Sequence, residues 1–143
     1  MKFITSISTL TAVLLSTAAF ADGHCAAGKT LDDGKLTIAT GNPSYYPWVM
    51  DDNPESGQGF EAAVAYAVAN AMGFENDDVV WVRSSFDEAI QPGPKNFDMN
   101  MQQYSITAER DEVVDFSDPY YTAPMAVLVA PGAASTQPAM ADL

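Results

Sequence analysis

Short apolar runs separated by polar segments predict four β-strands along the chain. The first run, at residues 35–40, reads Lys-Leu-Thr-Ile-Ala-Thr, and a Gly-Asn-Pro-Ser loop follows it. The other runs lie at residues 79–82, 97–101 and 125–129. Each is short and bounded by turn-forming residues, which is typical of strands buried in a sheet.

The segments between these strands predict three helices. Apolar residues recur at helical spacing from residue 60, and Gly73 follows where a C-terminal cap is expected. Ser85 stands three residues before Glu88, which is the spacing of a capping box at the start of a short helix. A third helix is expected at residues 108–113, beginning at Thr107. The apolar stripe of the first helix consists of Phe60, Val64, Val68 and Met72, with Ala67 and Ala71 beside it.

This alternation of strand and helix predicts an α/β fold with a parallel or mixed sheet and flanking helices. The chain has 143 residues, of which 48% are hydrophobic and 17% charged, so it has material for one modest domain. No internal repeat is visible. The segment from residue 131 to residue 138 is rich in Gly, Ala, Ser, Thr and Gln and is interpreted as a linker.

The first 21 residues predict a secretory signal peptide. Lys2 supplies the positive start, residues 4–15 form an apolar run, and Ala-Phe-Ala at residues 19–21 is a cleavage pattern. The run is short and no stop-transfer pattern follows, which disfavours a membrane anchor. The residues before Cys25 differ from those of a lipid-attachment motif. Soluble export is therefore expected, with a leader at residues 22–34 of the mature chain.

Charge and composition exclude several kinds of function. The net charge is -13 at pH 7 and the Lys and Arg residues are scattered, whereas nucleic-acid binding needs a basic patch that neutralises phosphates. Cys25 is the only cysteine and His24 the only histidine in the sequence. An internal disulfide, a cysteine metal site, a cofactor and a catalytic triad are therefore not expected.

Three loops that follow strands carry residues suited to binding a small molecule. In α/β sheets, ligands bind beyond the carboxyl ends of the strands, where such loops converge. Aromatic faces can sandwich a ligand side chain, while a guanidinium and a helix start favour a carboxylate. The candidate site residues are Tyr45 after the first strand, Phe86 after the second, and Gln102, Gln103, Ser105 and Arg110 after the third.

Each of these residues also has a purely structural interpretation. The two aromatics are compatible with the core or its rim, and the two glutamines with an ordinary polar loop. Arg110 is close in sequence to Asp111, Glu112 and Asp115, with which it could form a solvated surface ion pair of little energetic weight. Ser105 or Thr107 could serve only as a helix cap. Their convergence at one sheet edge favours a binding site.

Four motifs in this order resemble the family 3 solute-binding proteins, which are periplasmic receptors for polar amino acids that feed ABC transporters. The resemblance covers residues 34–129. The motifs are Gly34-Lys35-Leu36-Thr37-Ile38, Gly59-Phe60-Glu61, Ser105-Ile106-Thr107-Ala108-Glu109-Arg110 and Asp115-Phe116-Ser117-Asp118-Pro119-Tyr120-Tyr121.

The resemblance implies a type II periplasmic-binding-protein lobe at residues 35–130, followed by a linker at 131–143 toward a second lobe. It implies that Tyr45 and Phe86 flank the ligand side chain, and that Arg110 with Ser105 holds the α-carboxylate. Gln102 and Gln103 stand where family members use small residues or Ser near the α-amino group, so here they narrow the pocket or contact the ligand. The partners implied are an amino acid or related carboxylate and a membrane permease, and no catalysis or cofactor is implied.

Two departures from the family pattern qualify these expectations. The motif Gly-Phe-Asp-x-Asp is Gly59-Phe60-Glu61-Ala62-Ala63 here, so its second acid is missing. The position before the first aromatic, often acidic in receptors for basic ligands, falls near Gly41-Asn42, which weakens a lysine or arginine ligand. The alternatives are a periplasmic cyclohexadienyl-type dehydratase on the same scaffold, or the ligand-sensing domain of a membrane signalling protein.

Overall fold

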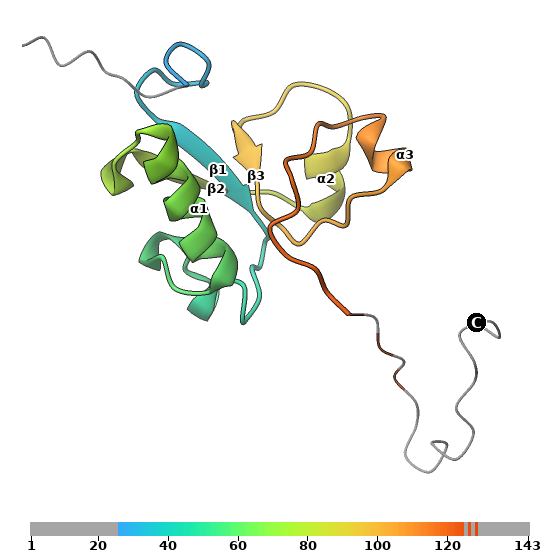
Figure 1. Cartoon of the computed structure of the whole chain (residues 1–143). Coiled ribbons are helices and arrows are strands. Elements are labelled where there is room, and N and C mark those ends of the chain that lie inside the picture. Colours follow the sequence, from blue (N-terminus) through green and yellow to red (C-terminus); the bar gives the residue numbers. More distant parts are fainter. Residues whose placement is uncertain (1–25, 125, 127, 129–143) are drawn as a thin grey trace, which may run out of the picture. The chain divides into compact units, whose positions relative to one another are not determined.

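The computed structural model describes residues 26–124, 126 and 128. The chain divides into two units, Met1–Tyr104 and Ser105–Leu143. The first unit contains the sheet and most of the helices (Figure 1), and the second contains one short helix, α3. In chain order the elements are β1 (Leu36–Thr40), η1 (Met50–Asp52), η2 (Pro54–Ser56), α1 (Phe60–Met72), η3 (Asn76–Asp78), β2 (Val79–Arg83), α2 (Phe86–Ile90), β3 (Met99–Asn100) and α3 (Ala108–Asp111).

The sheet has three parallel strands in the order β2-β1-β3, which confirms the expected α/β class. β1 is central and all five of its residues are buried, as expected for a strand covered on both faces. β1 pairs with β2 along its whole length, from Leu36 with Val79 to Thr40 with Arg83. The β1, α1 and β2 segments thus form a parallel strand-helix-strand unit, with the carboxyl ends of the strands at one edge.

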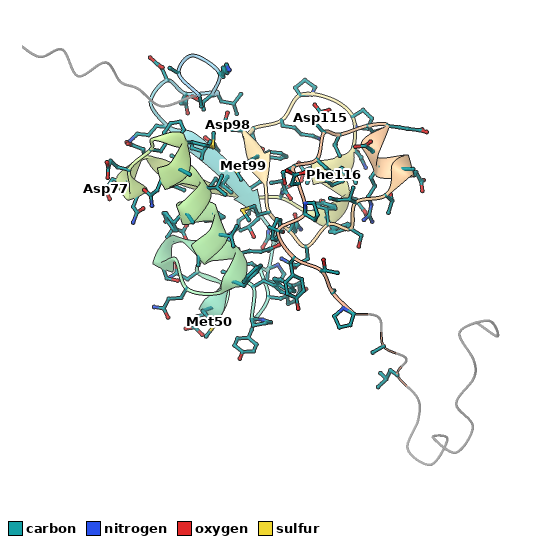
Figure 2. All side chains as sticks on the ribbon, viewed as in Figure 1. Met50, Asp77, Asp98, Met99, Asp115 and Phe116 are labelled. Carbon is teal, nitrogen blue, oxygen red and sulfur yellow. The ribbon has the colours of Figure 1, made fainter. Side chains whose placement is uncertain are left out.

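β3 is shorter than the strand expected at residues 97–101, because Asp98 takes over the pairing before it. Its N–H donates to the Thr37 carbonyl O at 2.8 Å, and its carboxylate accepts from the Thr37 N–H at 2.7 Å. The other carboxylate oxygen accepts from the Leu31 N–H, also at 2.7 Å. Asp98, at the start of β3 beside Met99 (Figure 2), therefore ties the leader to the central strand.

α1 covers one face of the sheet, but with a different face from the one that the apolar stripe predicts. The fully buried apolar residues of the helix are Ala62, Ala65 and Ala69, whereas Phe60 is 39% exposed. Alanine lets the helix approach the sheet closely, so the larger Val64 and Met72 pack at the margin of the core. The remaining stripe residues, Ala67 and Ala71, are exposed and Val68 is half-buried. The core cluster comprises Ala26, Leu36, Ile38, Ala65, Ala69, Phe74 and Met101.

The expected helix boundaries are largely confirmed. Gly73 caps α1 in the left-handed conformation with φ 98°, and the Ser85 hydroxyl accepts from the Glu88 N–H at the start of α2. Thr107 caps α3 in the same way, by accepting from the Arg110 N–H. α3 ends at residue 111 rather than 113, because the chain tightens there into a turn in which the Val113 N–H donates to the Arg110 carbonyl O.

The fourth strand expected at residues 125–129 falls mostly outside the described residues, and so does the segment 1–25 with its expected signal peptide, His24 and Cys25. Residues 126 and 128 are described and lie outside any strand. Among the helices of the described residues, none has the length and apolar character needed to cross a membrane.

Candidate ligand-binding site

A pocket of about 180 Å³ lies at the carboxyl edge of the sheet, within the first unit. The residues around it come from the ends of the strands and the loops that follow them, where an α/β sheet places its ligands. Four of the six candidate residues line it together. The full lining is Thr40, Gly41, Pro43, Ser44, Tyr45, Phe86, Gln102 and Gln103, all of which are uncharged at pH 7.

The loop after β1, residues 41–52, is held by the guanidinium of Arg83 at the end of β2. Arg83 Nη1 donates to the Gly41 carbonyl O at 2.9 Å, to Ser44 Oγ at 2.9 Å and to Asp52 Oδ1 at 2.6 Å. Arg83 Nη2 donates to the Asp52 carbonyl O at 2.6 Å. One planar cation therefore fixes both ends of the loop that carries Tyr45.

Asp52 completes this network through the backbone and side chain of Ser44. Its Oδ1 accepts from the Ser44 hydroxyl at 2.7 Å and from the Ser44 N–H at 2.9 Å. These two hydrogen bonds, followed by the interaction with Arg83, hold the pKa of Asp52 below its ordinary value of 3.8. Because hydrogen bonds to a carboxylate favour its charged form, Asp52 stays ionised at neutral pH and keeps the loop closed.

An aromatic pair forms another wall of the pocket. The ring of Phe86, at the start of α2, stacks on the ring of Tyr104 with centroids 4.1 Å apart and an interplanar angle of 28°. The Tyr104 hydroxyl donates to the Phe86 carbonyl O. Stacking and hydrogen bond together fix the orientation of Phe86, whereas Tyr45 across the pocket is 63% exposed.

Gln102 occupies the centre of the sheet edge, between β1 and β2. Its Nε2 lies 3.4 Å from the Ser84 carbonyl O, and its Oε1 lies 3.3 Å from Asn100 Nδ2. A Cβ at Gly41 would lie 2.9 Å from the Pro43 carbonyl O and 3.3 Å from Gln102 Nε2. Glycine at position 41 therefore allows the first loop to approach the Gln102 amide closely.

Gln103 is bound by a buried carboxylate from α1. Its backbone N–H donates to Glu61 Oε1 at 2.9 Å, and its side-chain amide donates to Glu61 Oε2. Gln103 has φ 54°, a left-handed conformation that non-glycine residues adopt rarely. Both glutamines of the site thus have protein partners, and their side chains form the floor and rim of the pocket.

Ser105 and Arg110 belong to the second unit. There, Arg110 Nη1 donates to the Ser105 carbonyl O at 3.0 Å across the first turn of α3. This contact connects the two residues of the expected carboxylate clamp to each other. Their joint action on a ligand in the pocket stays a prediction.

A sequence model of the bacterial extracellular solute-binding proteins, family 3, matches residues 36–138. The chain belongs to this family. The match covers both the sheet of the first unit and the α3 segment of the second. The family resemblance inferred from the four motifs is therefore confirmed.

Two curated members of this solute-binding family are similar to the chain. One, a probable histidine-binding protein from Neisseria gonorrhoeae, is 29% identical over 131 residues, which are 92% of this chain and 48% of the relative. The other, a probable histidine-binding protein from Campylobacter jejuni, is 35% identical over 89 residues, or 60% of this chain and 33% of the relative. The chain thus spans half or less of the length of these relatives. No solved structure matches the chain significantly.

Sequence patterns alone did not single out four residues that shape the pocket of this family member, namely Ser44, Glu61, Arg83 and Tyr104. Glu61 had a detectable signal, because it lies four and eight residues before Ala65 and Ala69 and so shares their buried face. Arg83 had a weaker one, as the cation that ends an apolar strand. The partnerships of Ser44 and Tyr104 depend on tertiary contacts and leave no local pattern.

Proposed function

We propose that this chain forms one wall of a periplasmic amino-acid receptor, which delivers its ligand to the membrane permease of an ABC transporter. The observation that carries the proposal is the pocket at the carboxyl edge of the sheet, where two aromatic rings and two amides surround an uncharged space. The family of the chain is one of extracellular solute-binding proteins, which agrees with this role.

The pocket lining favours a ligand whose side chain is flat and neutral. Tyr45 and Phe86 offer ring faces, and Gln102, Thr40 and Ser44 offer polar groups without a full charge. A cationic side chain would find no carboxylate among the lining residues. Neutral histidine fits these properties, and the names of the two curated relatives point to the same amino acid. L-histidine is therefore the first ligand to test.

The α-carboxylate of such a ligand is assigned to Arg110, with Ser105 beside it. Arg110 stands in the first turn of α3, where unpaired backbone N–H groups add to the positive potential. A guanidinium binds a carboxylate through two parallel hydrogen bonds, which also fixes the orientation of the ligand. Both residues lie within the segment that matches the family.

The pocket is smaller than the about 300 to 1,000 Å³ that encloses a typical ligand, and its rim residue Tyr45 is exposed. A second wall, supplied by the part of the relatives that this chain does not span, would bury the remaining ligand surface. We assign the delivery step to closure of these two walls around the amino acid, which the permease would then recognise.

The test is isothermal titration calorimetry of the full-length protein with L-histidine, L-arginine, L-glutamine and L-glutamate. Tightest binding of L-histidine is expected, and preference for L-arginine or for no amino acid would contradict the proposal. In the same protein, Arg110→Ala should lower affinity at least about thirtyfold, because truncating one partner of a buried charge pair costs roughly 2 to 5 kcal/mol. The matched control is Lys95→Ala, whose amine donates to carbonyl groups of α2 away from the pocket.

A further inference from the structure

The carboxylate of Glu61 is buried, with only 1% of the residue exposed, and yet it is absent from the pocket lining. We propose that Glu61 is a positioning residue that determines ligand specificity by holding Gln103 in the pocket rim. The proposal rests on the proposed amino-acid receptor function, and it concerns which side chains the pocket admits.

The geometry of Gln103 shows why it needs such a partner. Gln103 is exposed and has φ 54°, which costs free energy for a residue with a Cβ and persists only where surrounding contacts enforce it. Glu61 provides those contacts on both the backbone N–H and the side-chain amide. The two oxygens of one carboxylate thus fix the backbone and the side chain of Gln103 together.

Glu61 itself is fixed by the start of α1. Its backbone N–H donates to the Trp48 carbonyl O at 3.0 Å, and Gly59 before it has φ 103°. The first turn of a helix carries a partial positive charge, which stabilises a carboxylate there. Glu61 also shares the buried face of Ala65 and Ala69, so the sheet lies behind it and limits its alternatives.

The consequence for the ligand is a rigid wall. With both its amide groups directed to Glu61, Gln103 cannot swing away from the pocket to admit a bulkier side chain. Loss of Glu61 releases Gln103 and widens the site. Glu61 therefore acts on the discrimination between ligands of different size, and not only on the affinity for one of them.

The experiment compares four forms of the full-length protein: wild type, Glu61→Ala, Gln103→Ala and Glu55→Gln, the last being an exposed glutamate as control. First, amide hydrogen exchange of Gln103 is measured by NMR without ligand. Glu61→Ala should raise its exchange rate about 10- to 100-fold, the effect of losing a hydrogen bond to a charged group. Second, the affinities for L-histidine and L-tryptophan are measured by calorimetry.

The affinity ratio of L-histidine to L-tryptophan should fall about tenfold or more in Glu61→Ala, and in Gln103→Ala, while Glu55→Gln keeps the wild-type ratio. A uniform loss for both ligands with an unchanged ratio would overturn the proposal, and so would unchanged exchange at Gln103. If Glu61→Ala fails to fold, Gln103→Ala decides through the ratio. If the wild type binds neither amino acid, the receptor function is wrong, and the exchange rates alone decide whether Glu61 holds Gln103.

Discussion

The two loops that border the pocket are held in place by different kinds of interaction. The loop at residues 41–52 is closed by Arg83 and Asp52, whose side chains are 31% and 47% exposed. The loop after β3 is held by Glu61, which is 1% exposed, and it begins at Met101, which belongs to the core. Both loops follow a strand of the same sheet, but water reaches only the first network freely.

Burial decides how much each network contributes. An ion pair near water gains little, because the solvent screens it and competes for its hydrogen bonds. A hydrogen bond to a buried carboxylate is costly to break, because the groups left behind find no water. The comparison indicates a rigid side of the pocket formed by Gln102 and Gln103, and an adjustable side formed by the loop that carries Tyr45.

The change with the largest expected effect is Gly59→Ala, because it disturbs both sides. A Cβ at Gly59 would lie 2.5 Å from the Trp48 carbonyl O, and φ is 103°. Trp48 belongs to the first loop, and its carbonyl O accepts from the N–H of Glu61, the anchor of the second. A loss of about 2 to 5 kcal/mol in the free energy of unfolding is expected in urea denaturation, from strain and overpacking combined.

Gly57→Ala is the matched control for this prediction. Gly57 also has positive φ, 66°, but the nearest atom to its added Cβ would be a ring carbon of Tyr66 at 3.4 Å, an ordinary contact. The expected loss is the conformational cost alone, roughly 1 to 2 kcal/mol. Equal losses for the two variants would show that the close approach of Trp48 to Gly59 has no energetic weight.

Glu61→Ala should come next in magnitude. It leaves the Gln103 N–H without its buried acceptor, so about 1 to 3 kcal/mol of unfolding free energy should be lost. Glu55→Ala, at an exposed position, should stay within about 0.5 kcal/mol of wild type. A Glu61 variant as stable as the Glu55 variant would remove the distinction between a rigid and an adjustable side.

Arg83→Gln tests the exposed network and should have a smaller effect. Affinity for L-histidine should fall by at most about fivefold, because the pair with Asp52 is partly solvated. The difference from wild type should shrink further in 1 M salt, where the Debye length falls to about 3 Å. Affinity differences measured by calorimetry at low and high salt check this, and a loss larger than that of Glu61→Ala would reverse the comparison.

The fold was largely predictable from the sequence, because its elements have strong local signals. The apolar runs at β1 and β2 and the glycine that ends α1 mark the strand-helix-strand unit with little dependence on tertiary context. The buried face of α1 was not predictable from hydrophobicity, since close packing on the sheet selects its alanines over Phe60 and Val68. The length of β3 depends on Asp98, a side chain that replaces part of the strand ladder.

The candidate site divides along the same line. Tyr45, Phe86 and the two glutamines follow strand ends, and the topology alone brings such positions to one edge of the sheet. The residues that hold them lie 39 and 42 positions away in sequence, as with Ser44 to Arg83 and Glu61 to Gln103. Contacts of that kind arise from packing, and a single sequence contains no local pattern for them.

Acidification should weaken the adjustable side of the pocket first and with the smallest overall effect. The pKa of Asp52 lies below 3.8, because it accepts hydrogen bonds from Ser44 and faces Arg83. A lowered pKa in the folded protein means that this contribution to stability is present above pH 3.8 and is lost as the pH falls through the lower folded value. The measurement is the chemical shift of the Ser44 amide in NMR spectra recorded downward from pH 5, with Asp77→Asn, at an exposed position, as control. Asp52→Asn should remove the titration of this amide while the control keeps it. An unchanged titration in Asp52→Asn would mean that another group closes the loop.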